Sequence, residues 1–331
     1  MDDLSALVRE LYGDPPADPF ARGRVEARLQ ARTRRRVPWK AGVAGLAAAM
    51  ALGAAIVVPN LGTHATRDTF SGNPILLTAA TMAEAAPTGS YWHVKRLYTM
   101  RWDKLYGSGG NTYRLETSNL AEQWVSTDGR VWSGHKRLAA RPLDEAAWRR
   151  DGAPTEWKAG DGVHSTTPGE GRLTEVAGGG SFRFGGEDLT PAQLAELPTD
   201  PAALTERARR VIRADGVEEG SVSDVVPTTL ATLLYELPAA PEVRAAAYRA
   251  LATLPRVTVE EGAEDPTGRP GVSVSFPLQH DQPTRGRLIV DPGTSMVLAY
   301  EVTGAPGKGD RTEVVLASGW TDAEPAPPTT G

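Results

Sequence analysis

The stretch from Ser90 to Trp102, SYWHVKRLYTMRW, decides the fold class of this chain. Successive residues of a β-strand point to opposite faces, so the pattern can be divided into two sets. One face contains Trp92, Val94, Arg96, Tyr98, Met100 and Trp102, and the other contains Tyr91, His93, Lys95 and Leu97. Aromatic residues on both faces and the alternation over more than ten residues predict one long β-strand.

Strands of the same kind are predicted on both sides of a helical block. Before the block they cover residues 113–117, 122–126, 130–138, 172–176 and 181–184, with Asp128-Gly129 as a hairpin turn. After the block they cover residues 256–261, 270–278, 285–290, 295–303 and 311–317, with a turn at Asp291-Pro292-Gly293. The sequence therefore predicts two groups of strands separated by helices.

Helix signals are clear in the block itself and at the start of this region. A first helix is expected from Pro74 to Ala86. Thr190 to Gln193 forms a capping box with proline at the first helical position, and Asp200-Pro201 begins a longer helix. Two more helices have apolar stripes and are ended by Pro238 and Pro255.

The order of these elements predicts an α+β domain with an antiparallel sheet, because βαβ alternation is missing. We expect a single curved, half-barrel-like sheet with helices packed on it. Two separate sheets joined by the helical block are the alternative.

An apolar run precedes this domain, from Ala41 to Val58, AGVAGLAAAMALGAAIVV. Eighteen helical residues span roughly 27 Å, which is close to the thickness of a bilayer core. Basic residues lie on its N-terminal side, so the positive-inside rule places residues 1–40 in the cytoplasm and the following domain outside. A cleaved secretory signal is the competing interpretation, with Thr63-His64-Ala65 as the cleavage site.

The predicted organisation has five parts along the chain. They are a cytoplasmic helical tail (1–40), a transmembrane helix (41–59), a linker (60–72), an extracytoplasmic α+β domain (73–321) and a disordered, proline-rich tail (322–331). The cytoplasmic tail contains an apolar stripe at helical spacing, formed by Leu4, Leu7, Val8 and Leu11. So short a helix is unstable alone in water, and its stripe is therefore a candidate partner-binding site.

Composition excludes several kinds of chemistry. The chain has no cysteine, which rules out thiol catalysis, thiolate zinc sites and iron–sulfur clusters. Residues 1–40 have a net charge of about +3. Because the whole chain has a net charge of −5, the remaining residues have a net charge of about −8. Nothing in this distribution indicates direct binding of nucleic acid. The histidines are widely spaced, and no nucleophile, phosphate or dinucleotide motif is convincing, so we predict no enzyme activity, cofactor or metal.

Six of the eight tryptophans lie between Trp92 and Trp157. Alternating aromatic side chains either line a ligand cavity or fill the core of a sheet without disulfides, and the second interpretation is favoured. The candidate cavity residues are Trp92, Tyr98, Trp102, Trp124 and Trp132.

Several short motifs resemble an uncharacterised actinobacterial family of single-pass membrane proteins. They are Met1 to Leu4 with Leu7 and Arg9 to Leu11, the breaks at Pro15-Pro16 and Asp18-Pro19, Arg28-Leu29, Leu194 to Leu204, Val290 to Pro292, and Gly319-Trp320. Genes of this family often accompany extracytoplasmic-function sigma factors. The resemblance implies a signalling role and an ectodomain similar to the half-open barrel of lipoprotein carriers and of periplasmic regulators of sigma-factor release.

Two functions from different classes follow. The leading hypothesis is a membrane-anchored sensor or regulatory protein, anti-sigma-like, whose tail engages a sigma factor or another cytoplasmic protein. A zinc-type anti-sigma domain is ruled out because the first forty residues contain neither cysteine nor histidine. The alternative is an extracytoplasmic module that binds a lipid or another apolar ligand.

Overall fold

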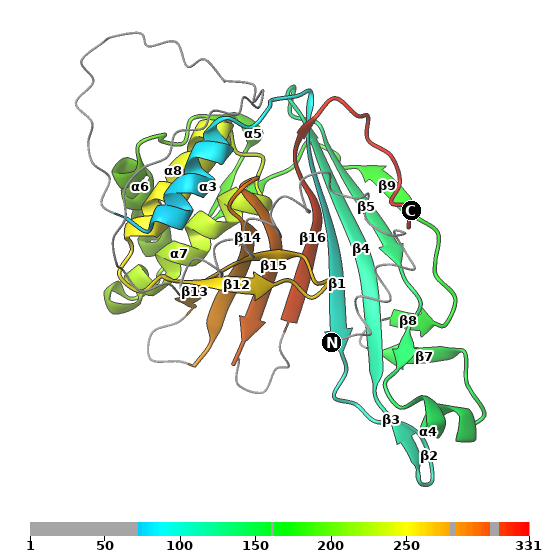
Figure 1. The fold of residues 1–331 in the computed structure, drawn as a ribbon. Coiled ribbons are helices and arrows are strands. Elements are labelled where there is room, and N and C mark those ends of the chain that lie inside the picture. Colours follow the sequence, from blue (N-terminus) through cyan, green and yellow to red (C-terminus); the bar gives the residue numbers. More distant parts are fainter. Residues whose placement is uncertain (1–71, 160–161, 279–282, 305–310, 331) are drawn as a thin grey trace, which may run out of the picture. The chain divides into compact units, whose positions relative to one another are not determined.

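The computed structural model describes residues 72–330 except 160–161, 279–282 and 305–310. Its main feature is one antiparallel sheet of ten strands (Figure 1). In spatial order the strands are β12 (Thr258–Glu264), β13 (Pro270–Pro277), β14 (Arg285–Asp291), β15 (Met296–Thr303), β16 (Arg311–Thr321), β1 (Tyr91–Arg101), β4 (Leu115–Ser126), β5 (Val131–Arg137) and β9 (Arg172–Glu175), and β6 (Arg141–Pro142) pairs with β4. The predicted α+β fold with one large antiparallel sheet and several helices is confirmed, and three two-stranded hairpins of the described residues lie outside this sheet.

The two groups of strands meet where β1 pairs with β16. The register runs from Tyr91 opposite Thr321 to Thr99 opposite Thr312, with a bulge between Lys95 and Arg96. The first strand of the domain therefore lies beside its last strand, and this pairing makes one sheet instead of two. Sequence patterns do not show which distant strands pair.

One prediction within the sheet was wrong. Residues 113–117 and 122–126 were expected as two strands, but β4 runs without interruption from Leu115 to Ser126. The polar residues Ser118 and Asn119 resemble a turn in sequence, yet they pair with Thr99 and Tyr98 of β1. The long neighbouring strand supplies hydrogen-bond partners along the whole length of β4, which keeps these residues extended.

Three of the described helices begin at residues whose side chains cap them. Asn73 caps α3 (Pro74–Glu84), and Asp200 caps α6 (Pro201–Ala214) through a bond from the Ala203 amide. The capping box of Thr190 and Gln193 starts the short α5 (Pro191–Ala195). The other two helices of this layer are α7 (Glu219–Tyr235) and α8 (Pro241–Thr253).

These helices cover one face of the β13–β16 part of the sheet, with α7 against the strands and α3 packed on α8 (Figure 1). The interface is a packed hydrophobic core. Its fully buried members include Trp92 from β1, Phe276 from β13, Leu288 from β14, Leu230 and Leu234 from α7, and Leu251 from α8. Each such side chain contributes roughly 1.5–3 kcal/mol by leaving water.

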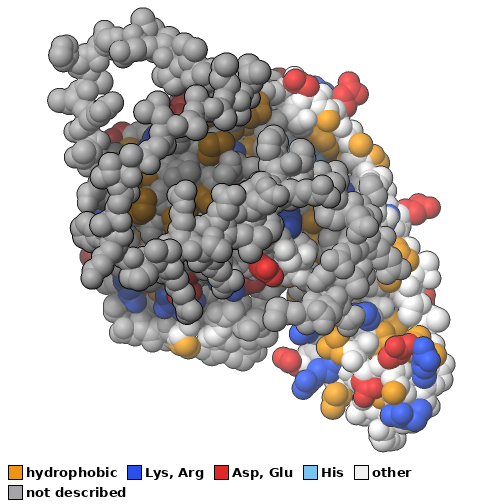
Figure 2. Space-filling view, viewed as in Figure 1, with side chains coloured by type: hydrophobic (Ala, Val, Ile, Leu, Met, Phe, Trp, Pro, Cys, Tyr) orange, Lys and Arg blue, Asp and Glu red, His pale blue; other side chains and the backbone are white. Residues whose placement is uncertain are grey.

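A second, smaller core lies at the far end of β1 and β4. It is built on the hairpin of β2 (Tyr106–Ser108) and β3 (Asn111–Tyr113), the helix α4 (Glu145–Arg150), and the hairpin of β7 (Glu156–Ala159) and β8 (Gly162–Ser165). Trp157 is buried here, and its indole N–H donates to the Tyr113 hydroxyl at 3.1 Å. Figure 2 shows acidic and basic side chains mixed over this end of the molecule. The remaining hairpin, β10 (Phe182–Phe184) with β11 (Glu187–Leu189), precedes α5.

Candidate functional site

The five aromatic candidates lie in three different places. Trp92 is fully buried in the main core, 5.9 Å from the ring of Trp320 and below the guanidinium of Arg244 at 5.3 Å. It therefore fills space between the sheet and the helices. Trp124 and Trp132 are directly opposite each other on β4 and β5, on the face of the sheet away from the helices. Tyr98 and Trp102 line a pocket.

This pocket, the Tyr98 pocket, lies where β1 and β4 extend beyond the helices and has a volume of about 350 Å³. That volume is within the usual range for small-molecule sites. Its lining comes from β1 and the residue that follows it, from β4, β5 and β16, and from the β7–β8 hairpin: Tyr98, Thr99, Met100, Trp102, Thr117, Asn119, Arg137, Ala159, Gly162, His164 and Arg311. None of these eleven residues is acidic, so the described part of the wall has a positive charge.

Arg137 and His164 form the basic side of the pocket. One guanidinium nitrogen of Arg137 donates to the carbonyl oxygen of Val163 at 2.8 Å, which holds the side chain at the pocket wall, and within the described residues its other N–H groups have no hydrogen-bond partner. Burial, together with the charge of Arg137, lowers the pKa of His164. His164 is therefore neutral at pH 7 and can offer both a donor and an acceptor.

Tyr98 and Trp102 form the aromatic side. Burial raises the pKa of Tyr98, so its phenol keeps its proton at physiological pH. The indole N–H of Trp102 donates to the hydroxyl of Thr117 at 3.0 Å, and its ring lies 6.1 Å from that of His164. The pocket thus combines flat apolar surfaces with fixed cationic donors, a combination suited to a small planar anion.

A series of ion pairs leads from the pocket to the helices, and we call it the ion-pair chain. Arg311 contacts Glu313, Glu313 lies 3.7 Å from Arg96, and Arg96 lies 3.6 Å from Glu236 at the end of α7. Glu313 is 2 % exposed and Arg96 is 13 % exposed. Burial raises the pKa of Glu313, although Arg311 and Arg96 oppose this shift.

The ion-pair chain was missed at the level of sequence, although a signal was present. Arg96 follows Trp92 and Val94 on the same strand face, so the pattern placed a charge in line with core residues. Glu313 of β16 is paired with Tyr98 on the neighbouring strand β1 and with Tyr300 on the neighbouring strand β15. A charge at a core-facing position indicates a partner, but the identity of that partner depends on the pairing of β1 with β16.

A second hollow, with a volume of about 310 Å³, lies beside Glu236 at the far end of the ion-pair chain. Glu236 belongs to its wall, together with Thr228, Thr229 and Thr232 of α7 and the turn at Gly185-Gly186. The ion-pair chain therefore connects the wall of the Tyr98 pocket, at Arg311, with the wall of this second hollow, at Glu236.

The remaining predicted site lies outside the described residues. Leu4, Leu7, Val8 and Leu11 belong to residues 1–71, as do the apolar run Ala41–Val58 and the linker, so their roles stay predictions. Within the described ranges, none of the helices is long and apolar enough to cross a membrane.

Comparisons with known proteins do not place this chain in a family. No family model and no curated protein matches this chain. A solved Pseudomonas aeruginosa MucA/MucB complex is similar over 74 % of this chain and 57 % of that chain, at 13 % identity and a TM-score of 0.26. A structure of MucB in complex with MucA(peri) has 11 % identity, a TM-score of 0.27 and coverages of 74 % and 56 %. The chain thus spans little more than half the length of these structures, and a likeness of this size shows no shared function.

Proposed function

We propose that this protein is a membrane-anchored sensor or regulatory protein and not an enzyme. In this proposal residues 41–58 cross the membrane, the described domain lies outside the cytoplasm, and the Tyr98 pocket binds the signal molecule. The tail stripe of Leu4, Leu7, Val8 and Leu11 engages a cytoplasmic protein, for which a sigma factor is the first candidate.

The observation that carries the proposal is the ion-pair chain between the pocket and α7. Arg311 belongs to the pocket wall and also neutralises Glu313. An anion that pairs with Arg311 weakens this contact and leaves Glu313 more dependent on Arg96. Because Arg96 also holds Glu236, binding in the pocket changes the electrostatic environment at the end of α7.

The pocket chemistry favours small aromatic carboxylates. Two cationic side chains supply charge-assisted hydrogen bonds, and two aromatic rings supply flat contact surfaces. A lipid would need an apolar cavity, but the face of the sheet under α7 is filled by buried side chains such as Leu230 and Phe276. The packed core therefore argues against the lipid-binding alternative.

Ligand binding is tested by calorimetric titration of the full chain in detergent with benzoate, indole-3-acetate and neutral indole. We expect the two carboxylates to bind and indole to bind at least about tenfold more weakly, since each lost charged hydrogen bond removes about 1.5–3 kcal/mol. Arg137→Ala should weaken carboxylate binding, whereas Arg149→Ala, an exposed arginine on α4, should not. Equal binding of indole and carboxylates would contradict the proposed ligand class.

The topology and the tail require separate tests. Alkaline phosphatase fused after residue 72 should be active only if the domain is exported, and a fusion after residue 20 should be inactive. A pull-down with residues 1–40 should recover a specific partner that is lost in Leu7→Asp. Failure to recover such a partner would refute the regulatory role of the tail.

A further inference from the structure

The face of the sheet away from the helices bears a second cluster of aromatic residues, the aromatic strip. It consists of Tyr91 and His93 on β1, Trp124 on β4 and Trp132 on β5. The His93 and Trp124 rings stack at 3.7 Å, and Tyr91 meets Trp124 and Trp132 edge-on at 6.5 and 6.0 Å. No helix is packed on this part of the described sheet (Figure 1).

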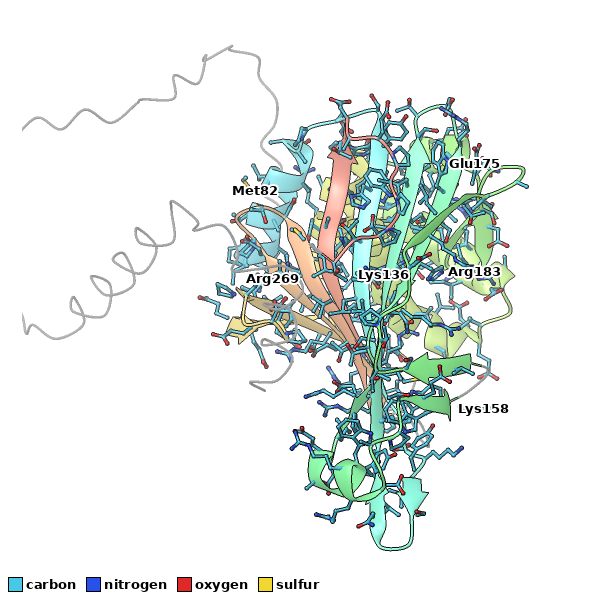
Figure 3. The ribbon with its side chains drawn as sticks, turned by 90° about the vertical axis from the view of Figure 1, so that its right-hand side faces the viewer. Met82, Lys136, Lys158, Glu175, Arg183 and Arg269 are labelled. Carbon is cyan, nitrogen blue, oxygen red and sulfur yellow. The ribbon has the colours of Figure 1, made fainter. Side chains whose placement is uncertain are left out.

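Instead, the proline-rich segment 322–330 lies over this face. In Figure 3 the segment passes in front of β1 and β4 and ends near the labelled Lys136. Its composition predicted disorder, but the structure shows several contacts. Asp322 accepts hydrogen bonds from the amide and hydroxyl of Ser90 at 3.0 and 2.8 Å. Lys95 donates to the carbonyl oxygen of Thr329 at 3.0 Å, and Lys136 lies 3.4 Å from the Thr330 hydroxyl.

Two glycines form a seat for Pro328, which is the one buried residue of the segment. A Cβ atom added at Gly134 of β5 would lie 3.0 Å from the ring of Pro328, and one added at Gly171 would lie 2.2 Å from its carbonyl oxygen. Gly134 follows Trp132 on the same strand face and is opposite Glu122 of β4. The proline seat is therefore continuous with the aromatic strip.

Charged residues beside the seat are held in position. Glu122 is 6 % exposed and lies 3.1 Å from both His93 and Lys95. It orients the Lys95 ammonium group toward the peptide carbonyl. Three prolines in the segment, Pro325, Pro327 and Pro328, have no N–H and cannot extend the sheet as a strand, so this face recognises side chains and carbonyl groups.

We propose that this face is a docking site for an extended, proline-containing peptide of a partner protein, and that segment 322–330 occupies it as an intramolecular competitor. The partner peptide has the chemistry of the resident segment: an acidic side chain that accepts from Ser90, followed by a proline that fits between Gly134 and Gly171. Prolines favour an extended conformation before binding, which reduces the entropy lost on docking.

The test uses the full chain with its resident segment released. Asp322→Ala combined with Pro328→Asp removes two anchors of the segment and leaves the face unchanged. A fluorescent peptide of residues 321–330 should bind this double variant at least about tenfold more tightly than the wild-type chain. The reason is that the resident segment competes at an effective concentration on the order of mM. Adding Gly171→Ala should abolish binding, whereas adding Gly110→Ala, a glycine with open space around its Cβ position, should not.

Three results would overturn the proposal. They are peptide binding that is equal in the wild-type chain and the double variant, peptide binding that survives Gly171→Ala, and a wild-type dimer that depends on residues 322–330, since the occupant would then be a second copy. If the double variant does not fold, hydrogen exchange on full chains decides. The Ser90 amide, which donates to Asp322, should exchange faster in Gly171→Ala than in Gly110→Ala, and equal exchange would refute the docking site.

Discussion

Replacing Leu230 by alanine tests whether the space between α7 and the sheet is a packed core or a ligand cavity. Leu230 has 0 % exposure and belongs to the main cluster, which contains residues of α7, α8 and the sheet. Truncation removes its apolar contacts and leaves a void, so we expect a loss of about 3 to 5 kcal/mol in the free energy of unfolding. For a domain of this size that loss lowers the melting temperature by roughly 10 °C.

Urea denaturation followed by tryptophan fluorescence measures this loss. The matched control is Leu105→Ala, because Leu105 is 59 % exposed and its truncation should change stability by no more than about 0.5 kcal/mol. A loss below about 1 kcal/mol for Leu230→Ala would refute the packed-core interpretation. It would restore the apolar-ligand hypothesis, since a ligand-lined cavity tolerates truncation of its wall.

Two further substitutions test particular interactions. Tyr248→Phe removes the hydrogen bond of a fully buried hydroxyl to the Ser295 carbonyl oxygen (2.8 Å), so it should cost about 1–3 kcal/mol in urea denaturation, and an unchanged midpoint would contradict this. Burial opposes ionisation of Glu122, but the His93 hydrogen bond and the charge of Lys95 outweigh it and lower the pKa of Glu122. The stability it contributes is therefore present above its ordinary pKa of 4.5 and is lost as the pH falls through the lower, folded-state value. The stability difference between wild type and Glu122→Gln should accordingly be largest at neutral pH and shrink in acid, and a difference that grows in acid would show that the sign is wrong.

Local signals in the sequence predicted most elements of the fold. The start signals at Thr190 and Asp200 begin helices where expected, the helix expected from Pro74 is α3, and the alternation from Ser90 to Trp102 forms β1. These features depend on residues close together in the chain, so their patterns are visible without a structure. The small elements around α4 were missed because their apolar residues are few and irregularly spaced.

The site was less predictable because it depends on contacts between distant segments. The choice of aromatic candidates found Tyr98 and Trp102, but it also included Trp92, which is in the core. Arg137 and Arg311 reach the same pocket from strands far apart in the sequence, and only the pairing of β1 with β4 and β16 brings them together. Neither residue has a local motif that indicates this role.

Hydrogen exchange of α7 in the full chain, with and without indole-3-acetate, tests most directly whether the Tyr98 pocket communicates with the helices. Ligand binding should change the exchange of the last turns of α7, near Glu236, in the wild-type protein. In Glu313→Gln, which removes the central charge of the ion-pair chain, the ligand should still bind but this change should be lost. Exchange in α7 that does not respond to bound ligand, or that responds equally in Glu313→Gln, would contradict the proposed sensing role.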